Sequence, residues 1–187
     1  MQAKTLLRYK ILSRIDMSTA TERSGMIIKS LVQRPEYISA HTVLLYYPVG
    51  HEVDTRPLFN DPERLLLLPF VDRPAVGEVR SVEELASAGT FKIPPAEADP
   101  SVLERLDLII LPGVAFSRAG YRVGRGGGWY DRFLDAINPR STRIGLCFSE
   151  QIEDFAPDSH DQPVDVIMTE TEVITTNARD RNPSRVA

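Results

Sequence analysis

The chain has 187 residues, of which 42% are hydrophobic, and a formal net charge of −4 at pH 7. This length and composition favour one globular domain with its own core. No apolar run approaches the roughly 18 residues that span a bilayer, no apolar signal segment opens the chain, and the single cysteine excludes an internal disulfide, so we expect a cytoplasmic protein.

The first predicted element is a helix over residues 3–14. Leu7 and Ile11 recur at helical spacing and form one apolar stripe, whereas Lys4 and Arg8 lie four positions apart on another face. Two neighbouring cations of this kind suit an anionic ligand. An ordinary solvated helix face is the alternative that the residues leave open.

A second helix is predicted to begin where Thr19 and Glu22 form a capping-box pattern. It runs to about residue 33, and Pro35 ends it. A second capping-box pattern, Ser81 with Glu84, predicts a short helix to about residue 88, and residues 129–137 form a further helical segment. Apolar, β-rich runs predict strands over residues 42–47, 64–69, 107–111, 142–147 and 164–169.

The alternation of strands and helices predicts an α/β fold with three layers, in which helices cover both faces of a mainly parallel sheet. We expect a single domain over residues 1–176 and a polar, frayed tail over residues 177–187. Ligands of such sheets bind at the carboxyl ends of strands, so the chemistry is expected just after Tyr47, Leu111 and Cys147.

Residues 111–134 carry the most informative pattern in the chain. Four glycines fall within positions 124–128, where backbone N–H groups followed by a helix start make a concave anion site. Arg122 and Arg125 add donors that suit phosphate oxygens. Asp131, early in the predicted helix, is a candidate ligand for Mg²⁺. Without further knowledge, these residues indicate a phosphate-binding loop.

Two common phosphate motifs are excluded. No Gly-Lys-Ser/Thr ending is present, so the segment is not a P-loop, and Trp129 breaks the Gly-x-Gly-x-x-Gly spacing of a dinucleotide fold. The alternative for this segment is a flexible surface loop without a ligand, but such loops rarely interleave glycine with Trp, Tyr and Arg.

The charge is unevenly spread along the sequence. Residues 1–34 have a net charge of +5 and residues 118–143 of +4, which leaves −13 for the rest. Two short basic segments in an acidic chain suggest a local anion site rather than a nucleic-acid surface. Solvated helix faces with a chance excess of arginine remain the alternative.

The sequence resembles one known family over most of its length, from residue 4 to about residue 170. Leu-Pro-Gly-Val-Ala-Phe at 111–116 and Gly-Tyr-Arg-Val-Gly-Arg-Gly-Gly-Gly-Trp-Tyr-Asp-Arg-Phe-Leu at 120–134 closely resemble the hallmark segment of the 5-formyltetrahydrofolate cyclo-ligase family. The Lys-x-x-x-Arg at 4–8, Tyr-Pro-Val-Gly-His-Glu-Val-Asp-Thr at 47–55, and Pro-Asp-Ser-His-Asp at 157–161 with Val-Asp at 164–165 resemble further family segments in the same order.

The resemblance implies a cytoplasmic enzyme that converts 5-formyltetrahydrofolate into 5,10-methenyltetrahydrofolate, with ATP as co-substrate and Mg²⁺ as cofactor. It implies Arg125 as the catalytic residue and Asp131 and Asp161 as metal ligands. The residues implied to contact the folate are Tyr47, Glu52, Arg125, Gly126, Gly127, Gly128 and Trp129. Those implied to contact ATP are Lys4, Thr5, Leu6, Leu7, Arg8, Arg122, Val123, Gly124, Arg125, Gly126, Gly127, Gly128, Trp129 and Tyr130.

Several of these residues have a plainer interpretation. Glu52 is equally compatible with a solvent-facing loop, and for Asp161 the residues alone favour a surface turn of Asp, Ser and Pro. Trp129 can stack on a ligand ring or pack in the core. His160 has no second histidine at ligand spacing, so a zinc site is not expected. Cys147 ends an apolar strand and is expected in the core rather than as a nucleophile.

The sequence departs from the family pattern at three positions. Ser117 stands where Asp is common, Trp129 where Tyr is usual, and Pro95 where Glu is common. Two rival functions remain open: a non-catalytic protein that binds reduced folates, and a sugar-phosphate or CoA-handling enzyme on a similar scaffold. The expected partners are small molecules, with neither nucleic acid nor membrane, and the protein is expected to be a monomer or a small homo-oligomer.

Overall fold

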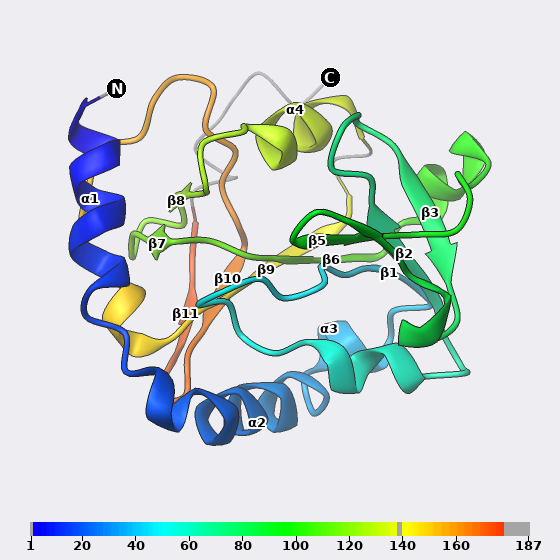
Figure 1. The fold of residues 1–187 in the computed structure, drawn as a ribbon, viewed down its shortest axis with the longest axis horizontal. Helices are drawn as coiled ribbons and strands as arrows, with labels where there is room; N and C mark the ends of the chain where they lie inside the picture. Colours follow the sequence, from blue (N-terminus) through cyan, green and yellow to red (C-terminus); the bar gives the residue numbers. More distant parts are fainter. Residues whose placement is uncertain (1, 138–139, 178–187) are drawn as a thin grey trace.

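A seven-stranded sheet lies at the centre of the structure, a computed structural model that describes residues 2–137 and 140–177 (Figure 1). The strand order is β11-β10-β9-β6-β1-β2-β3. Neighbours from β10 to β2 run parallel, whereas β3 and β11 are antiparallel edge strands. The strands are β1 (Thr42–Leu44), β2 (Leu65–Pro69), β3 (Val76–Val79), β6 (Leu108–Leu111), β9 (Thr142–Leu146), β10 (Val166–Met168) and β11 (Val173–Thr175).

Helices cover both faces of this sheet. The helices are α1 (Gln2–Leu12), α2 (Ala20–Leu31), α3 (Pro35–Ile38) and α4 (Trp129–Ala136), and the short 3-10 helices are η1 (Met17–Thr19), η2 (Arg56–Asn60), η3 (Val82–Glu84), η4 (Pro100–Arg105) and η5 (Ser149–Gln151). In Figure 1, α2 and α3 lie on one side of the strands and α4 on the other. The predicted three-layer α/β fold with a mainly parallel sheet is confirmed.

The core is divided by the sheet, because successive side chains of a strand point to opposite faces. Val43 of β1 packs into a cluster with Ile27 of α2, whereas the next residue, Leu44, packs with Phe133 of α4. All four residues of β6 are buried. Near-continuous apolar strands of this kind are typical of a parallel sheet covered on both sides, which explains why the central strands could be predicted.

Three local predictions are wrong. Residues 82–84 form only the short helix η3, and residues 86–88 form strand β4 instead of continuing the predicted helix. Thr19 makes no side-chain capping bond to α2, although Asp16 caps η1 by accepting from the Ser18 N–H. Pro35 begins α3 rather than ending α2, because a proline needs no N–H partner in the first turn of a helix.

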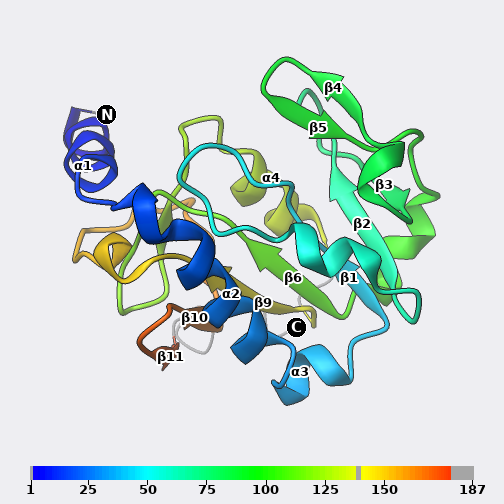
Figure 2. The ribbon, with the colours of Figure 1, turned by 60° about the horizontal axis from the view of Figure 1, so that its bottom comes forward.

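The shorter strands had no clear signal in the sequence. They comprise the edge strands β3 and β11 and two hairpins, β4 (Ala86–Ala88) with β5 (Phe91–Ile93) and β7 (Ala115–Phe116) with β8 (Arg122–Val123). Runs of two to four residues are too short to show a hydrophobic period. Figure 2 shows the β4–β5 hairpin standing beside β2 and β3 at one edge of the molecule.

The connections between the strands create a topological switch point at β1. From β1 the chain passes to β2 on one side, and it later enters β6 on the other side of β1. At such a switch point the loops that leave the two strands separate, and ligands bind between them.

The structure bears on two further expectations, one about membrane-spanning helices and one about the C-terminal tail. None of the helices in the described part of the chain combines the length and the apolar character needed to cross a membrane. The polar tail expected over residues 177–187 lies outside the described residues except for its first position, so it stays a prediction, as does the single domain over residues 1–176.

Gly145 provides a test of how tightly the sheet is packed. A Cβ built there would lie 2.3 Å from Cε1 of the Phe116 ring, which is buried in the core below α4. We expect Gly145→Ala to lower the free energy of unfolding by about 1–3 kcal/mol, because the overpacked side chains must shift. Chemical denaturation measures this change.

Gly25 of α2 is the matched control. A Cβ there would meet nothing within 4 Å, so Gly25→Ala should raise the stability by about 0.5–1 kcal/mol through the better helix propensity of alanine. Equal effects of the two substitutions would contradict this account of the packing around Phe116.

Candidate functional site

A cavity of about 380 Å³ lies at the carboxyl ends of β1 and β6. Its wall combines the loop after β1, the end of β2, the turn after β6, the glycine-rich segment and the β4–β5 hairpin. The lining residues from these parts include Tyr46, Tyr47, Val49 and Glu52; Leu68 to Asp72; Pro112 to Val114; Arg122, Gly124, Arg125 and Gly127 to Asp131; and Phe91 and Lys92. The cavity thus follows Tyr47 and Leu111, as predicted, whereas no residue after Cys147 belongs to its wall in the described part of the chain.

The glycine-rich loop joins β8 to α4 and needs glycine at two of its positions. Gly126 has φ of 110° and Gly128 has φ of 61°, a region that residues with a Cβ rarely adopt. Gly128 directly precedes the first turn of α4. At Gly124 and Gly127, by contrast, a Cβ would meet no atom within 4 Å, so the fold itself does not require glycine there.

A buried ion pair joins the two ends of this loop. The Arg122 guanidinium, with a side chain only 3% exposed, lies 3.0 Å from Oδ1 of Asp131 and donates to the carbonyl oxygen of Gln162 at 2.7 Å. The same Asp131 oxygen accepts from the Gln162 N–H at 3.1 Å. Burial lowers the pKa of Arg122, and the Asp131 charge opposes that shift. Arg122 therefore ties β8, α4 and the loop at 162 together, and its predicted contact with ATP stays a prediction.

Arg125 and Glu52 meet on the cavity wall, although 73 positions separate them in the sequence. Arg125 Nε donates to Oε1 of Glu52 at 2.9 Å, and the guanidinium also donates to the Val49 carbonyl oxygen. The second Glu52 oxygen accepts from the Val49 N–H at 2.9 Å. Burial raises the pKa of Glu52, while the hydrogen bond and charge of Arg125 lower it. Glu52 is therefore a wall residue of the cavity and not a solvent-facing loop residue.

Helix α1 brings its two predicted cations to the same region. Lys4 Nζ lies 2.6 Å from Oδ2 of Asp161 and 2.8 Å from Asp158, and Arg8 Nε donates to the Gly124 carbonyl oxygen at 2.7 Å. Both cations thus contact the loops where phosphate and metal groups were predicted, so neither is a plain solvated residue.

The residues between these two cations differ from them. Leu6 is 71% exposed and Leu7 packs against the core. Thr5 is exposed as well. Neither these three residues nor the two cations belong to the cavity wall, and the predicted contacts of all five with ATP stay predictions.

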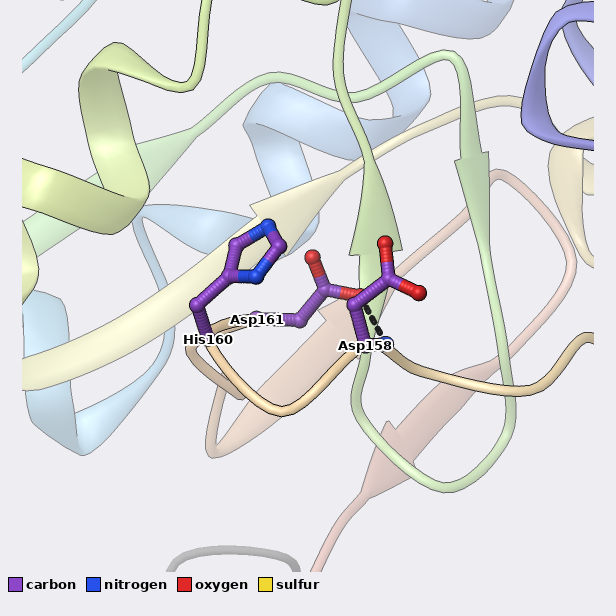
Figure 3. A group of neighbouring side chains, drawn as sticks. All are labelled: Asp158, His160 and Asp161. Atoms are coloured by element: carbon purple, nitrogen blue, oxygen red, sulfur yellow. Dashed lines mark hydrogen bonds between the residues drawn. The ribbon is translucent and has the colours of Figure 1, made fainter. Parts of the chain in front are cut away.

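One group of side chains has the spacing of a metal site. In Asp158, His160 and Asp161, one potential ligand atom of each lies within 4.8 Å of the others (Figure 3). The dashed bond in Figure 3 runs from the Asp158 N–H to Oδ2 of Asp161, at 2.8 Å. Carboxylate oxygens suit Mg²⁺, so the donor set fits that ion better than zinc, which prefers several nitrogen or sulfur ligands.

Asp131 does not belong to that group within the described residues. Asp131 is linked to this group through the backbone of Gln162, the residue after Asp161, because Oδ1 of Asp131 accepts a hydrogen bond from the Gln162 N–H. The two predicted metal ligands are thus brought to one region, but the potential metal ligands grouped with Asp161 are Asp158 and His160, and the Lys4 ammonium lies 2.6 Å from its Oδ2. The assignment of the ion to Asp131 and Asp161 stays a prediction.

Trp129 packs against the core and also borders the cavity, while its stacking on a ligand ring stays a prediction. Its ring stacks on Phe133 with 4.7 Å between centroids, and its Nε1 donates to the Arg73 carbonyl oxygen at 2.7 Å. It also lines the cavity. Cys147 is fully buried, and burial raises the pKa of its thiol, which confirms the prediction of a core residue.

Part of the cavity wall was missed by the sequence reasoning. Residues 68–72 follow the end of β2, so the rule that ligands bind at strand ends would have included them. Phe91 and Lys92 gave no such signal, because the segment before them was predicted as a helix, whereas β4 and β5 form a hairpin.

Comparisons with known proteins agree on one family. The model of the 5-formyltetrahydrofolate cyclo-ligase family matches residues 1–170. The NMR structure of 5,10-methenyltetrahydrofolate synthetase from Aquifex aeolicus superposes with a TM-score of 0.80 and 34% identity over 93% of both chains.

Two curated relatives carry the same family name. The 5-formyltetrahydrofolate cyclo-ligase of Mus musculus is 27% identical over 90% of this chain and 94% of its own length. The mitochondrial enzyme of that name from Arabidopsis thaliana is 28% identical over 73% of this chain, and the match spans 57% of the plant protein.

The Arg125–Glu52 contact predicts how a substitution of Arg125 changes the pKa of Glu52. We expect the Glu52 carboxyl to titrate above its ordinary pKa, because burial outweighs the effect of the guanidinium. Arg125→Gln should raise this pKa further, since it removes the positive charge that favours the carboxylate. Carboxyl ¹³C chemical shifts followed against pH measure the titration.

Arg132→Gln is the control, since Arg132 donates to the Gly127 carbonyl oxygen and makes no contact with Glu52. It should leave the Glu52 titration in place. A Glu52 pKa that falls in Arg125→Gln would show that the described ion pair is absent in solution.

Proposed function

Because the chain belongs to the 5-formyltetrahydrofolate cyclo-ligase family, we propose that it uses ATP and Mg²⁺ to convert 5-formyltetrahydrofolate into 5,10-methenyltetrahydrofolate, releasing ADP and phosphate. The observation that carries this proposal is that the glycine-rich loop and the Arg125–Glu52 pair share one cavity wall, while the cations of α1 contact the Gly124 carbonyl oxygen and Asp161. These parts lie far apart in the sequence, and each supplies a different element of the proposed chemistry.

In the proposed complex, ATP phosphates lie against residues 124–128. Gly126 and Gly128, with their positive φ values, turn the backbone so that no side chain blocks an approaching anion, and the first N–H groups of α4 follow at once. Arg8 supports the loop by its bond to the Gly124 carbonyl oxygen, and its charge favours the phosphates.

The pterin ring of the folate is assigned to the wall formed by Tyr47 and Glu52. A carboxylate that is half enclosed can accept hydrogen bonds from the ring's amino and N–H groups, and the pairing with Arg125 favours its charged form against the opposing effect of burial, which raises its pKa. Trp129 adds an aromatic face to the same cavity.

The region of Asp131 and Asp161 is where Mg²⁺ would be held. When bound, the ion supplies positive charge that neutralises phosphate oxygens. Asp161 is prepared for such a role, since its side chain is only 6% exposed and the Asp158 N–H fixes one oxygen. The Lys4 ammonium, 2.6 Å from that oxygen, would lie within reach of the same phosphates.

The proposed reaction needs no covalent nucleophile of the protein. The formyl oxygen attacks the γ-phosphorus of ATP, the bond to ADP breaks, and a phosphorylated formyl group results. N10 then attacks the formyl carbon and gives up its proton, and the carbon–oxygen bond breaks as phosphate leaves. Positioning and charge neutralisation carry most of the catalysis in such transfers. Arg125 lies on the cavity wall with its side chain 44% exposed, and we assign it to stabilising the charge of the phosphoryl group during transfer.

One assay tests the proposal. The protein is incubated with 5-formyltetrahydrofolate and Mg²⁺, with and without ATP, while methenyl absorbance and ADP are followed. We expect both to rise together only with ATP. Binding of the folate without ADP release would instead indicate a non-catalytic binding protein, and absorbance that changes without ATP would contradict the proposed chemistry.

The same assay tests Arg125. We expect Arg125→Ala to lower turnover by about 100-fold or more, the size of effect seen when one charge-stabilising donor is removed. Its stability should change by less than about 1 kcal/mol, since the partly exposed pair with Glu52 contributes little. Arg80→Ala, at an exposed residue outside the cavity wall, is the matched control and should retain full turnover. Equal losses of turnover and stability in Arg125→Ala would count against the assignment.

A further inference from the structure

The charged side chains of the cavity wall are almost all neutralised by the protein itself. Three acidic and three basic residues line the cavity: Glu52, Asp72, Asp131, Lys92, Arg122 and Arg125. Two of the acids pair with two of the bases across the wall, Glu52 with Arg125 at 2.9 Å and Asp131 with Arg122 at 3.0 Å.

The third acid also has a cation of its own. Asp72 lies 3.1 Å from Arg73, the residue that follows it. Lys92 is then the charged wall residue that the protein leaves without an ion pair within its described part. Its Nζ donates to the neutral hydroxyl oxygen of Ser87 at 2.9 Å. The wall therefore offers one positive charge to a ligand.

Lys92 enters the wall from a different direction than the other basic residues. It lies on β5, in the hairpin that stands beside β2 and β3 (Figure 2), whereas Glu52 and Arg125 come from the loop after β1 and the loop before α4. The base of the hairpin is fixed, because Ala98 N–H donates to the Val76 carbonyl oxygen at 2.9 Å. The backbone also packs so closely that a Cβ at Gly77 would lie 2.1 Å from the Ala96 oxygen. The hairpin is thus fixed against the edge of the sheet, and Lys92 lines the cavity from there.

We propose that Lys92 binds a carboxylate at the glutamate end of the folate substrate. This inference rests on the proposed function, which assigns the pterin ring to the wall around Glu52. A reduced folate carries its carboxylates at the end of the molecule opposite to the pterin, beyond an aromatic ring, so they meet a part of the wall away from Glu52. A half-buried lysine whose ammonium makes no ion pair with any described residue is suited to receive such a group.

The test compares two ligands that differ only in the tail: 5-formyltetrahydrofolate, and the amide of 5-formyltetrahydropteroate, in which a neutral amide replaces the glutamate so that no carboxylate remains. Binding is measured by calorimetry in the presence of a non-hydrolysable ATP analogue, and KM and kcat by the methenyl assay. Lys92→Gln should weaken binding of the glutamate-bearing compound, and raise its KM, by about fivefold, the size expected of one partly exposed ion pair. It should leave kcat, and the binding of the pteroyl amide, unchanged.

Two variants serve as controls. Lys92→Arg keeps the charge and should retain the affinity for the glutamate-bearing compound. Lys29→Gln removes an exposed cation of α2 and should leave the binding of both ligands unchanged. The difference between the two ligands should also shrink at high salt, since exposed ion pairs are screened.

Equal weakening of both ligands in Lys92→Gln, or no weakening of either, would overturn the role of Lys92. The proposed function would still stand in that case if the unchanged protein turns over 5-formyltetrahydrofolate with ATP. An unchanged protein that binds neither compound and shows no turnover would instead overturn the proposed function.

Discussion

The buried ion pair of Arg122 and Asp131 is the contact on which the arrangement of the site depends. A charge with 3% exposure of its side chain is costly unless it is paired and fully hydrogen-bonded, and here Asp131 and the Gln162 carbonyl oxygen provide the partners. Because Arg122 stands before the glycine-rich loop and Asp131 after it, the pair holds both ends of the loop. The backbone of Gln162 then fixes the position of Asp161 as well. One interaction therefore places the loop and the acidic group beside each other.

The uneven charge of the sequence has a structural explanation. The basic N-terminal segment does not face solvent alone, because it pairs with acids near the other end of the chain: Lys4 with Asp161, Arg14 with Glu153, and Arg23 with Glu150. These pairs attach α1 and α2 to the segments after β9. These cations thus do not form plain solvated faces, and the local anion site stays a proposal. Some of the cations stabilise the fold, and Lys4 and Arg8 do so beside the loop that we assign to phosphate.

The fold class could be predicted because the central strands are apolar on both faces, as in β6, where all four residues are buried. The site could be predicted in outline because glycine, arginine and carboxylates are concentrated in a few segments. The sequence could not show which side chains pair between segments that lie far apart in the chain. Nothing in its local pattern places Glu52 against Arg125, or Lys92 on a hairpin beside the cavity, because these contacts depend on where β1, β2 and β6 end. The strand β4 was mistaken for a helix because its three residues show no period of their own.

In the proposed reaction, the formyl oxygen is phosphorylated and then expelled as phosphate in the cavity at the ends of β1 and β6. The most direct measurement uses 5-formyltetrahydrofolate labelled with ¹⁸O in the formyl group, with mass analysis of the phosphate that a reaction with unlabelled ATP releases. If the formyl oxygen attacks the γ-phosphorus, the released phosphate carries the label in step with methenyl formation. Unlabelled phosphate, with the ¹⁸O found in water, would contradict the account.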